Sequence, residues 1–88
     1  MKWKINYSRY AENFLKKNDI RDDIRRDLVK FLKKMRGESI NIDVKKLKGS
    51  WKDYYRLRRG KVRIIFDVDY KDRSLFVEKI DFRGEVYK

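Results

Sequence analysis

The stretch that sets the fold is residues 54–70, which read YYRLRRGKVRIIFDVDY. Aromatic or β-branched side chains are frequent in both halves of it, residues 54–58 and 61–70, and Arg59-Gly60 lies between them. This pattern is typical of a β-hairpin, in which a two-residue loop fixes which residues lie opposite each other. A loop at Arg59-Gly60 predicts four pairs: Arg58 with Lys61, Leu57 with Val62, Arg56 with Arg63, and Tyr55 with Ile64.

The predicted register sorts the hairpin by face, because successive side chains of a strand point to opposite sides of the sheet. The apolar side chains face a core, and the other face carries four cations: Arg56, Arg58, Lys61 and Arg63. Like charges directly opposite each other destabilise a sheet, so a purely structural sequence more often sets an acid against an arginine. A functional patch is therefore favoured over a solvated basic face, which stays the alternative.

The basic residues extend well beyond the hairpin. Residues 45–63 contain nine Lys and Arg and one acid, Asp53, which places +8 of the formal net charge of +12 in one segment. Crowded like charges do not favour folding, whereas a polyanion that binds them releases its counterions. We therefore interpret the segment as a phosphate-binding surface. Its further members are Lys45, Lys46, Lys48, Lys52 and Arg59.

One strand and two helices are expected before the hairpin. Residues 2–7 alternate apolar and polar side chains, as a strand with one buried face does. Ser8 can cap a first helix, and Asn18-Asp19 interrupts the helical pattern and offers a second cap. The second helix, from Ile20 to Met35, carries one apolar stripe and ends at Gly37.

A last strand is expected at residues 75–82, after the polar turn 71–74, and residues 40–44 form a linker or a short extended piece. This order of elements favours an α+β fold. It consists of an N-terminal strand, a helical hairpin and then an antiparallel β-meander, with the helices packed on one sheet face. The length of 88 residues suits a single domain, residues 1–88.

Composition excludes several kinds of chemistry. The chain has no Cys and no His, which removes disulfides, thiolate nucleophiles, zinc knuckles and the usual general base. Any catalysis must use Arg, Lys, Tyr, Asp or Glu, and we expect no metal site and no small-molecule cofactor. No apolar run approaches the ~20 residues of a membrane span, and the first residues lack the apolar stretch of a signal peptide. We therefore expect a cytoplasmic protein with no membrane partner.

The last residues, 83–88, form a second short motif, RGEVYK. A guanidinium such as that of Arg83 suits phosphate oxygens, and a phenol such as that of Tyr87 can stack on a base or move a proton. A terminal tyrosine by itself is more often a packing residue or frayed. Next to a basic hairpin, Tyr87 becomes a candidate for the same site.

These motifs together resemble one known family. The succession KLKG at 46–49, DYYRLRRGKVRIIF at 53–66 and RGEVYK at 83–88 is similar to that of the RelE-type toxins of type II toxin-antitoxin modules, in the RelE/ParE superfamily. The resemblance extends over nearly the whole chain, because the size and the order of elements also agree.

The resemblance implies a ribosome-dependent endoribonuclease that cuts mRNA in the decoding site and so inhibits translation. In that family a ribose 2′-hydroxyl attacks the adjacent phosphate without a metal and leaves a 2′,3′-cyclic phosphate. The catalytic residues implied by matching motifs are Arg56, Arg58, Arg63, Arg83 and Tyr87. The implied contacts to RNA or the ribosome are Lys45, Lys46, Lys48, Lys52, Arg59 and Lys61. One position departs from the pattern, because Asp81 stands where some bacterial members carry a basic residue.

The resemblance also implies partners: the ribosome, its mRNA and a RelB-type antitoxin, the last in an expected heterotetramer. Two rival interpretations remain. One is a ParE-like inhibitor of DNA gyrase. The other is a non-catalytic basic module that binds nucleic acid and stacks bases on Trp51, Tyr54 and Tyr87. Trp51 alone is more often a packing residue at the edge of a core.

Overall fold

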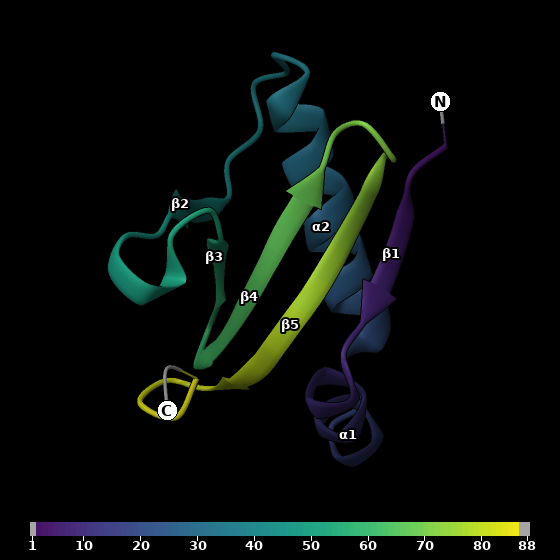
Figure 1. Ribbon diagram of the computed structural model, residues 1–88. Coiled ribbons are helices and arrows are strands. Elements are labelled where there is room, and N and C mark those ends of the chain that lie inside the picture. Colours follow the sequence, from purple (N-terminus) through teal and green to yellow (C-terminus); the bar gives the residue numbers. More distant parts are fainter. Residues whose placement is uncertain (1, 87–88) are drawn as a thin grey trace.

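The computed structural model describes residues 2–86, and Figure 1 shows how their elements are arranged. In chain order these are β1 (Lys4–Tyr7), α1 (Arg9–Lys17), α2 (Arg21–Met35), β2 (Asp43–Lys46), the 3₁₀ turn η1 (Gly49–Trp51), β3 (Tyr55–Arg59), β4 (Val62–Asp69) and β5 (Ser74–Phe82). The five strands form one sheet in the order β1-β5-β4-β3-β2. α2 lies across one face of the sheet, and α1 lies beyond the end of β1 (Figure 1). Neither helix of this range is long and apolar enough to cross a bilayer.

The sheet confirms the predicted α+β class and refines it in two places. β3, β4 and β5 form the antiparallel meander, but β1 is a parallel neighbour of β5, so the sheet is mixed. The two helices carry the chain from β1 at one edge of the sheet to β2 at the other edge. Residues 40–44, predicted as a linker or short extended piece, lead into β2, which begins at Asp43 and pairs antiparallel with β3 at the sheet edge.

The hairpin loop is Gly60-Lys61, one residue later than predicted. Arg59 pairs with Val62 and Arg58 with Arg63. Gly60 has a φ of +56° and takes the first loop position, where a type II′ turn favours glycine. The predicted loop would have forced Arg59 into that left-handed region. The correction leaves each strand residue on its predicted face but moves Lys61 out of the strand.

Local hydrogen bonds set the ends of the helices. Ser8 caps α1 as predicted, because its hydroxyl oxygen accepts the Ala11 N–H at 3.1 Å. The second predicted cap is wrong. Asn18 instead closes α1 by donating from its side chain to the Phe14 carbonyl at 3.0 Å. α2 then starts after Ile20, which provides no side-chain cap.

The main core lies between the sheet and the helices. Its fully buried members include Ile24, Leu28 and Phe31 of α2 and Leu57, Ile64 and Phe66 of the hairpin. The Phe31 ring meets those of Tyr55 and Phe66 with centroids 5.1 and 4.9 Å apart. Each fully buried side chain of this size contributes about 1.5–3 kcal/mol to folding. The apolar hairpin face predicted from the sequence therefore holds the sheet against α2.

The opposite face of the sheet carries no helix (Figure 1). Two apolar residues, Ile65 and Val86, are fully buried and yet lie outside the helix-side cluster. Ile65 follows Ile64 in β4 and so points to this open face. Between β4 and β5 the register shifts by one residue, because Lys79 lies opposite Ile65 and Val77 opposite Phe66. This β-bulge adds a residue to β5 beside the positions that carry the basic side chains.

Candidate nucleic-acid interface

Strand pairing gathers the predicted arginines on the open face, because residues directly opposite each other in neighbouring strands share a face. One row crosses four strands and consists of Asp43, Arg58, Arg63 and Asp81, each opposite the next. The adjacent row consists of Lys45, Arg56, Ile65 and Lys79. Three of the predicted catalytic arginines therefore lie side by side on β3 and β4.

Arg63 is the most buried arginine of this face, with 6% of its surface exposed. Its Nη1 donates to the carbonyl oxygens of Gly60 at 2.7 Å and Val62 at 3.2 Å, which anchors the guanidinium at the hairpin loop. Burial lowers the pKa of Arg63, and the nearby charges of Arg58, Arg56 and Arg83 lower it further. An arginine stays charged in proteins despite such effects, so Arg63 is a fixed cation held among other cations.

Arg56 and Arg58 share one acid. Asp43 at the start of β2 accepts from Arg56 Nη2 at 2.8 Å through Oδ1 and from Arg58 Nη1 at 3.3 Å through Oδ2. The Arg56 side chain is 15% exposed, against 46% for Arg58. The Nε of Arg56 is buried and has no hydrogen-bond partner among the described residues. Of the two guanidinium groups, that of Arg58 is therefore the one open to a further anion.

Arg83 joins the same group from the C-terminal turn. Its backbone N–H donates to the Lys61 carbonyl at 2.8 Å, which fastens the segment after β5 to the hairpin loop. Its charge acts on Arg63, as its lowering of the Arg63 pKa shows. We call Arg56, Arg58, Arg63 and Arg83 the arginine cluster. Tyr87, the remaining predicted catalytic residue, lies outside the described residues.

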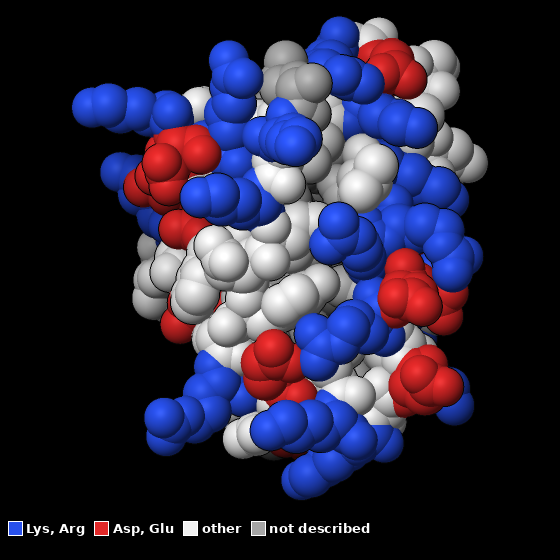
Figure 2. Space-filling view, turned by 90° about the vertical axis from the view of Figure 1, so that its right-hand side faces the viewer, with Lys and Arg blue, Asp and Glu red and all other residues white. Residues whose placement is uncertain are grey.

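The arginine cluster is suited to phosphate. Guanidinium groups present several N–H donors in a plane, and charge-assisted hydrogen bonds to phosphate oxygens are about twice as strong as neutral ones. The side of the molecule formed by β1 and α2 differs, because Lys and Arg there are interspersed with acids around an apolar centre (Figure 2). An extended polyanion therefore finds its concentrated positive charge on the open face of the sheet.

Comparisons with known proteins bear on the fold. No family model and no curated protein matches the sequence. A solved structure of the archaeal RelE–RelB complex from Pyrococcus horikoshii OT3 matches at 26% identity with a TM-score of 0.60. That match covers 98% of this chain and 100% of the other.

Two further complexes agree. The RelB–RelE complex from Methanococcus jannaschii matches at 24% identity and a TM-score of 0.61, covering 93% of this chain and 94% of the other. The heterotetrameric YoeB–YefM complex from Staphylococcus aureus matches at 21% identity and a TM-score of 0.70, covering 94% and 99%. The chain has the fold of the RelE-type toxins. The resemblance to RelE-type toxins that the sequence motifs indicated is therefore confirmed for the fold.

One predicted RNA contact of this RelE-like chain does not belong to the open face. Arg59 points to the helix side, where its Nη1 donates to Asp27 Oδ2 at 2.8 Å and its Nη2 lies 3.4 Å from Asp23 Oδ1. The hydrogen bond to Asp27 raises the pKa of Arg59. Alternation along β3 turns Arg59 towards α2, where it ties the hairpin to the helix, so it lies apart from the arginine cluster; its contact to RNA stays a prediction.

The predicted lysines of the RelE-like chain lie at several places on the surface, and one of them shares the face of the arginine cluster. Lys45 lies opposite Arg56 and shares the open face. Lys46 lies opposite Tyr55, whose ring packs in the main core, so Lys46 points to the other side of the sheet edge. The remaining three are exposed in the connections between strands: Lys48, Lys52 and Lys61. Lys61 thus lies at the loop that holds Arg83 rather than in the row of arginines.

Sequence reasoning missed the part played by Tyr10 of α1. Its hydroxyl donates to Asp81, which raises the pKa of Tyr10, and the ammonium of Lys79 lies 5.0 Å from its ring centroid. Asp81 lies opposite Arg63 in the sheet, at the position where some RelE-type toxins carry a base. Tyr10 therefore forms a hydrogen bond with Asp81, the acid next to Arg63 at the border of the arginine cluster. No local signal in the sequence pointed to Tyr10, because its partner Asp81 lies 71 residues away.

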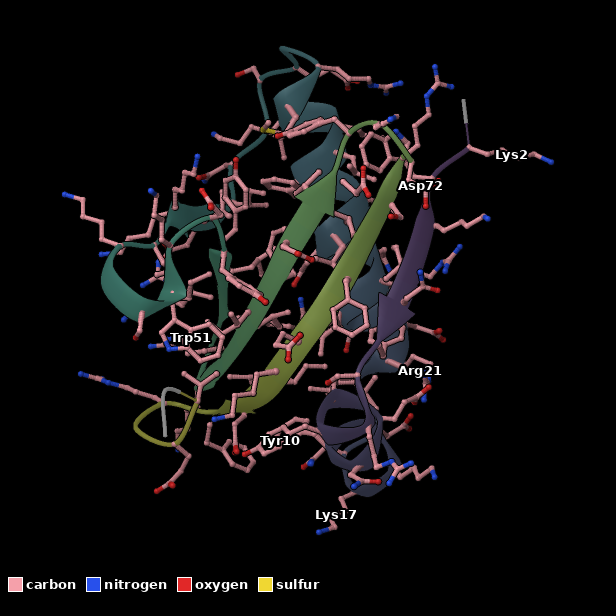
Figure 3. The ribbon with its side chains drawn as sticks, viewed as in Figure 1. Lys2, Tyr10, Lys17, Arg21, Trp51 and Asp72 are labelled. Carbon is pink, nitrogen blue, oxygen red and sulfur yellow. The ribbon has the colours of Figure 1, made fainter. Side chains whose placement is uncertain are left out.

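Trp51 lies in the lower half of the view in Figure 3, as does Tyr10. Its ring meets the Tyr54 ring edge-on, with centroids 5.3 Å apart. Neither ring belongs to the helix-side core. Trp51 is therefore a packing residue, as predicted, but it packs on Tyr54 and not at the edge of that core.

Among residues 2–86, no group of three or more Asp or Glu side chains is arranged to hold a metal ion.

Proposed function

We propose that this chain is the toxin of a type II toxin-antitoxin module and that it cuts mRNA on the ribosome. The observation that carries the proposal is the arginine cluster, in which two strands bring three guanidinium groups to one sheet face and the C-terminal turn holds Arg83 near enough for its charge to act on Arg63. A solvated basic face does not need like charges opposite each other, as Arg58 and Arg63 are. The matched structures include RelE, YoeB and YafQ toxins, which supports the same class of function.

The proposed reaction is an in-line attack by a ribose 2′-hydroxyl on the adjacent phosphorus. The bond from O2′ to phosphorus forms and the bond from phosphorus to O5′ breaks, which leaves a 2′,3′-cyclic phosphate and a 5′-hydroxyl. Arg63 and Arg83 offset the charge that grows on the phosphate oxygens, and Arg56 and Arg58 hold the phosphate. A well-placed donor of this kind contributes about 3 to 4 kcal/mol to stabilising the transition state.

The arginine cluster does not itself transfer the protons of this reaction. An arginine side chain does not readily give up a proton, so the cluster acts through charge. The chain contains no His, and by family resemblance Tyr87 orients a base or carries the proton. Much of the rate then comes from the geometry that the ribosome imposes on the mRNA, because aligned reacting groups remove a large entropic barrier. We therefore propose ribosome dependence as a part of the mechanism.

The proposed partner that silences the toxin is a RelB-type antitoxin in the cytoplasm, in a heterotetramer. Two of the matched structures are RelE–RelB complexes and a third is a heterotetramer of YoeB with YefM. A groove between β1 and α2 has an apolar floor that includes Trp3, Ile5 and Leu32 and a basic rim of Arg25, Lys33 and Arg36. An acidic amphipathic segment suits such a groove through both its charge and its apolar face.

The test is primer extension on mRNA from cells that express the chain without its antitoxin. Cuts in phase with codons are expected, and they should disappear when Arg63 and Arg83 are both replaced by alanine. Intact mRNA with inhibited supercoiling by DNA gyrase would instead support the ParE-like function. Intact mRNA and unaffected gyrase, with RNA binding preserved, would leave only the non-catalytic binding module.

A further inference from the structure

Asp43 is an acid that contacts two members of the arginine cluster at once. One carboxylate oxygen accepts from Arg56 at 2.8 Å and the other lies 3.3 Å from Arg58. Arg58 is also its direct partner in the sheet register. Of the charges that act on Arg63, that of Asp43 is the one that raises its pKa, while Arg58, Arg56 and Arg83 lower it. The carboxylate therefore lies between two arginines of the cluster and acts on the charge of a third.

The geometry of this contact is that of an anion with two oxygens between two guanidinium groups. A phosphodiester presents the same feature through its two non-bridging oxygens, and arginine binds carboxylate and phosphate in the same forked manner. The Arg56 side chain is 15% exposed, so surrounding atoms hold its guanidinium in place, while the Arg58 side chain is 46% exposed and open to solvent.

The carboxylate is also free to leave. Asp43 is the first residue of β2, a four-residue strand paired on one side only at the edge of the sheet. Its side chain is 48% exposed, so its carboxylate can rotate into water without losing apolar contacts. Lys45, two positions along the same strand, lies opposite Arg56 and remains on the same face. When the acid turns away, the site gains net positive charge and still has its arginines in place.

We propose that Asp43 occupies the phosphate position between Arg56 and Arg58 as an internal counterion, and that an RNA phosphodiester displaces it. The inference rests on the proposed function and adds to it the identity of the group that competes with RNA. Asp43 thereby limits the affinity of the free protein for arbitrary RNA, and a substrate held by the ribosome overcomes this limit.

The test compares RNA affinity after removal of the charge at position 43. The variants are Asp43→Asn and Asp43→Ser, and Asp72→Asn is the matched control. Asp72 is exposed in the turn between β4 and β5, at the end of the sheet away from Trp51 (Figure 3). The probe is a fluorescein-labelled, 2′-O-methylated single-stranded RNA of about 12 nucleotides, titrated at several salt concentrations. Thermal unfolding of each variant confirms that it is folded.

We expect both Asp43 variants to bind the probe about three- to tenfold more tightly than the wild type, with a salt slope steeper by about 0.7, the value for one further phosphate contact on a single strand. The control should change affinity less than twofold. Equal or weaker binding by a folded Asp43 variant overturns the inference, because it would mean that Asp43 positions the arginines without competing with RNA. Absence of salt-dependent binding by the wild type and by both Asp43 variants would overturn the proposed function as well.

Discussion

Replacing Arg59 or Arg63 with methionine should have different effects, because the two arginines lie on opposite faces of the hairpin. Arg59 stabilises the fold, whereas Arg63 belongs to the proposed site. Arg59→Met leaves Asp27, which is 8% exposed, without its donor. A buried acceptor left unpaired costs about 1–3 kcal/mol, and we take about 1–2 because water reaches part of the ion pair. A domain of this size loses about 4–8 °C of Tm per kcal/mol, so the Tm should fall by about 4–16 °C.

Arg63→Met should behave in the opposite way. It removes hydrogen bonds to the Gly60 and Val62 carbonyls, but it also removes a buried charge that Arg56, Arg58 and Arg83 repel. Loss of these hydrogen bonds costs about 1 kcal/mol each, and relief of the repulsion among the arginines offsets much of it, so stability should change by no more than about 1 kcal/mol. The cleavage rate should fall about 100- to 1000-fold, as expected for loss of one phosphate-directed donor.

The assay pairs thermal unfolding, followed by circular dichroism, with mRNA cleavage in a reconstituted translation reaction, with rates divided by the folded fraction. The double variant Asp27→Leu with Arg59→Met is the control, since removing both partners should restore much of the lost stability. Loss of cleavage in folded Arg59→Met, or full cleavage by Arg63→Met, would refute the assignment of the two arginines to opposite faces.

Three further perturbations test individual contacts. Gly60→Ala should destabilise the fold by about 1 kcal/mol, because the φ of +56° is unfavourable for a side chain while the added Cβ meets no atom within 4 Å; the urea midpoint reports it. Ser8→Ala should lose about 1 kcal/mol through the missing cap, again by urea unfolding, whereas Ser8→Thr should retain most of it. Asp81→Asn should lower the pKa of Tyr10 towards its usual value in an absorbance titration, because the hydrogen bond to Asp81 raises it. A raised Tyr10 pKa stabilises the fold at pH values below the ordinary phenol pKa, so this stabilisation should be constant near neutral pH. It should disappear as the pH rises through the Tyr10 pKa of the folded state. An unchanged Tyr10 titration in Asp81→Asn would contradict the contact.

Local rules predicted most of the fold from the sequence. The alternation in residues 54–70 placed Leu57, Ile64 and Phe66 in the core because one buried face imposes a period of two. Gly37 ends α2 as predicted, with a φ of +95° and an N–H that bonds back to Lys34. The hairpin loop lies one residue later than predicted, because Gly60 takes the first loop position, where φ is positive and Arg59 would be strained.

The site was predicted less completely, because its missing parts depend on pairing between distant segments. The alternation along β3 and β4 identified Arg56, Arg58 and Arg63 as one group. Nothing in the local pattern indicated that Asp43 pairs with Arg58, since the short strand β2 carries only four residues and follows a polar segment. The same holds for Arg59, whose partner Asp27 lies 32 residues away on α2. Such contacts follow from sheet order, which periodicity does not specify.

The central claim is that the arginine cluster stabilises charge on an mRNA phosphate positioned by the ribosome. Its most direct test is the single-turnover cleavage rate of one mRNA, measured free and on programmed ribosomes, for the wild type and for Arg63→Met. We expect cleavage by the wild type on ribosomes only, with a 2′,3′-cyclic phosphate at the new end, and a rate about 100- to 1000-fold lower for Arg63→Met. Equal rates on free and ribosome-bound mRNA, or an unaltered rate for Arg63→Met, would contradict it.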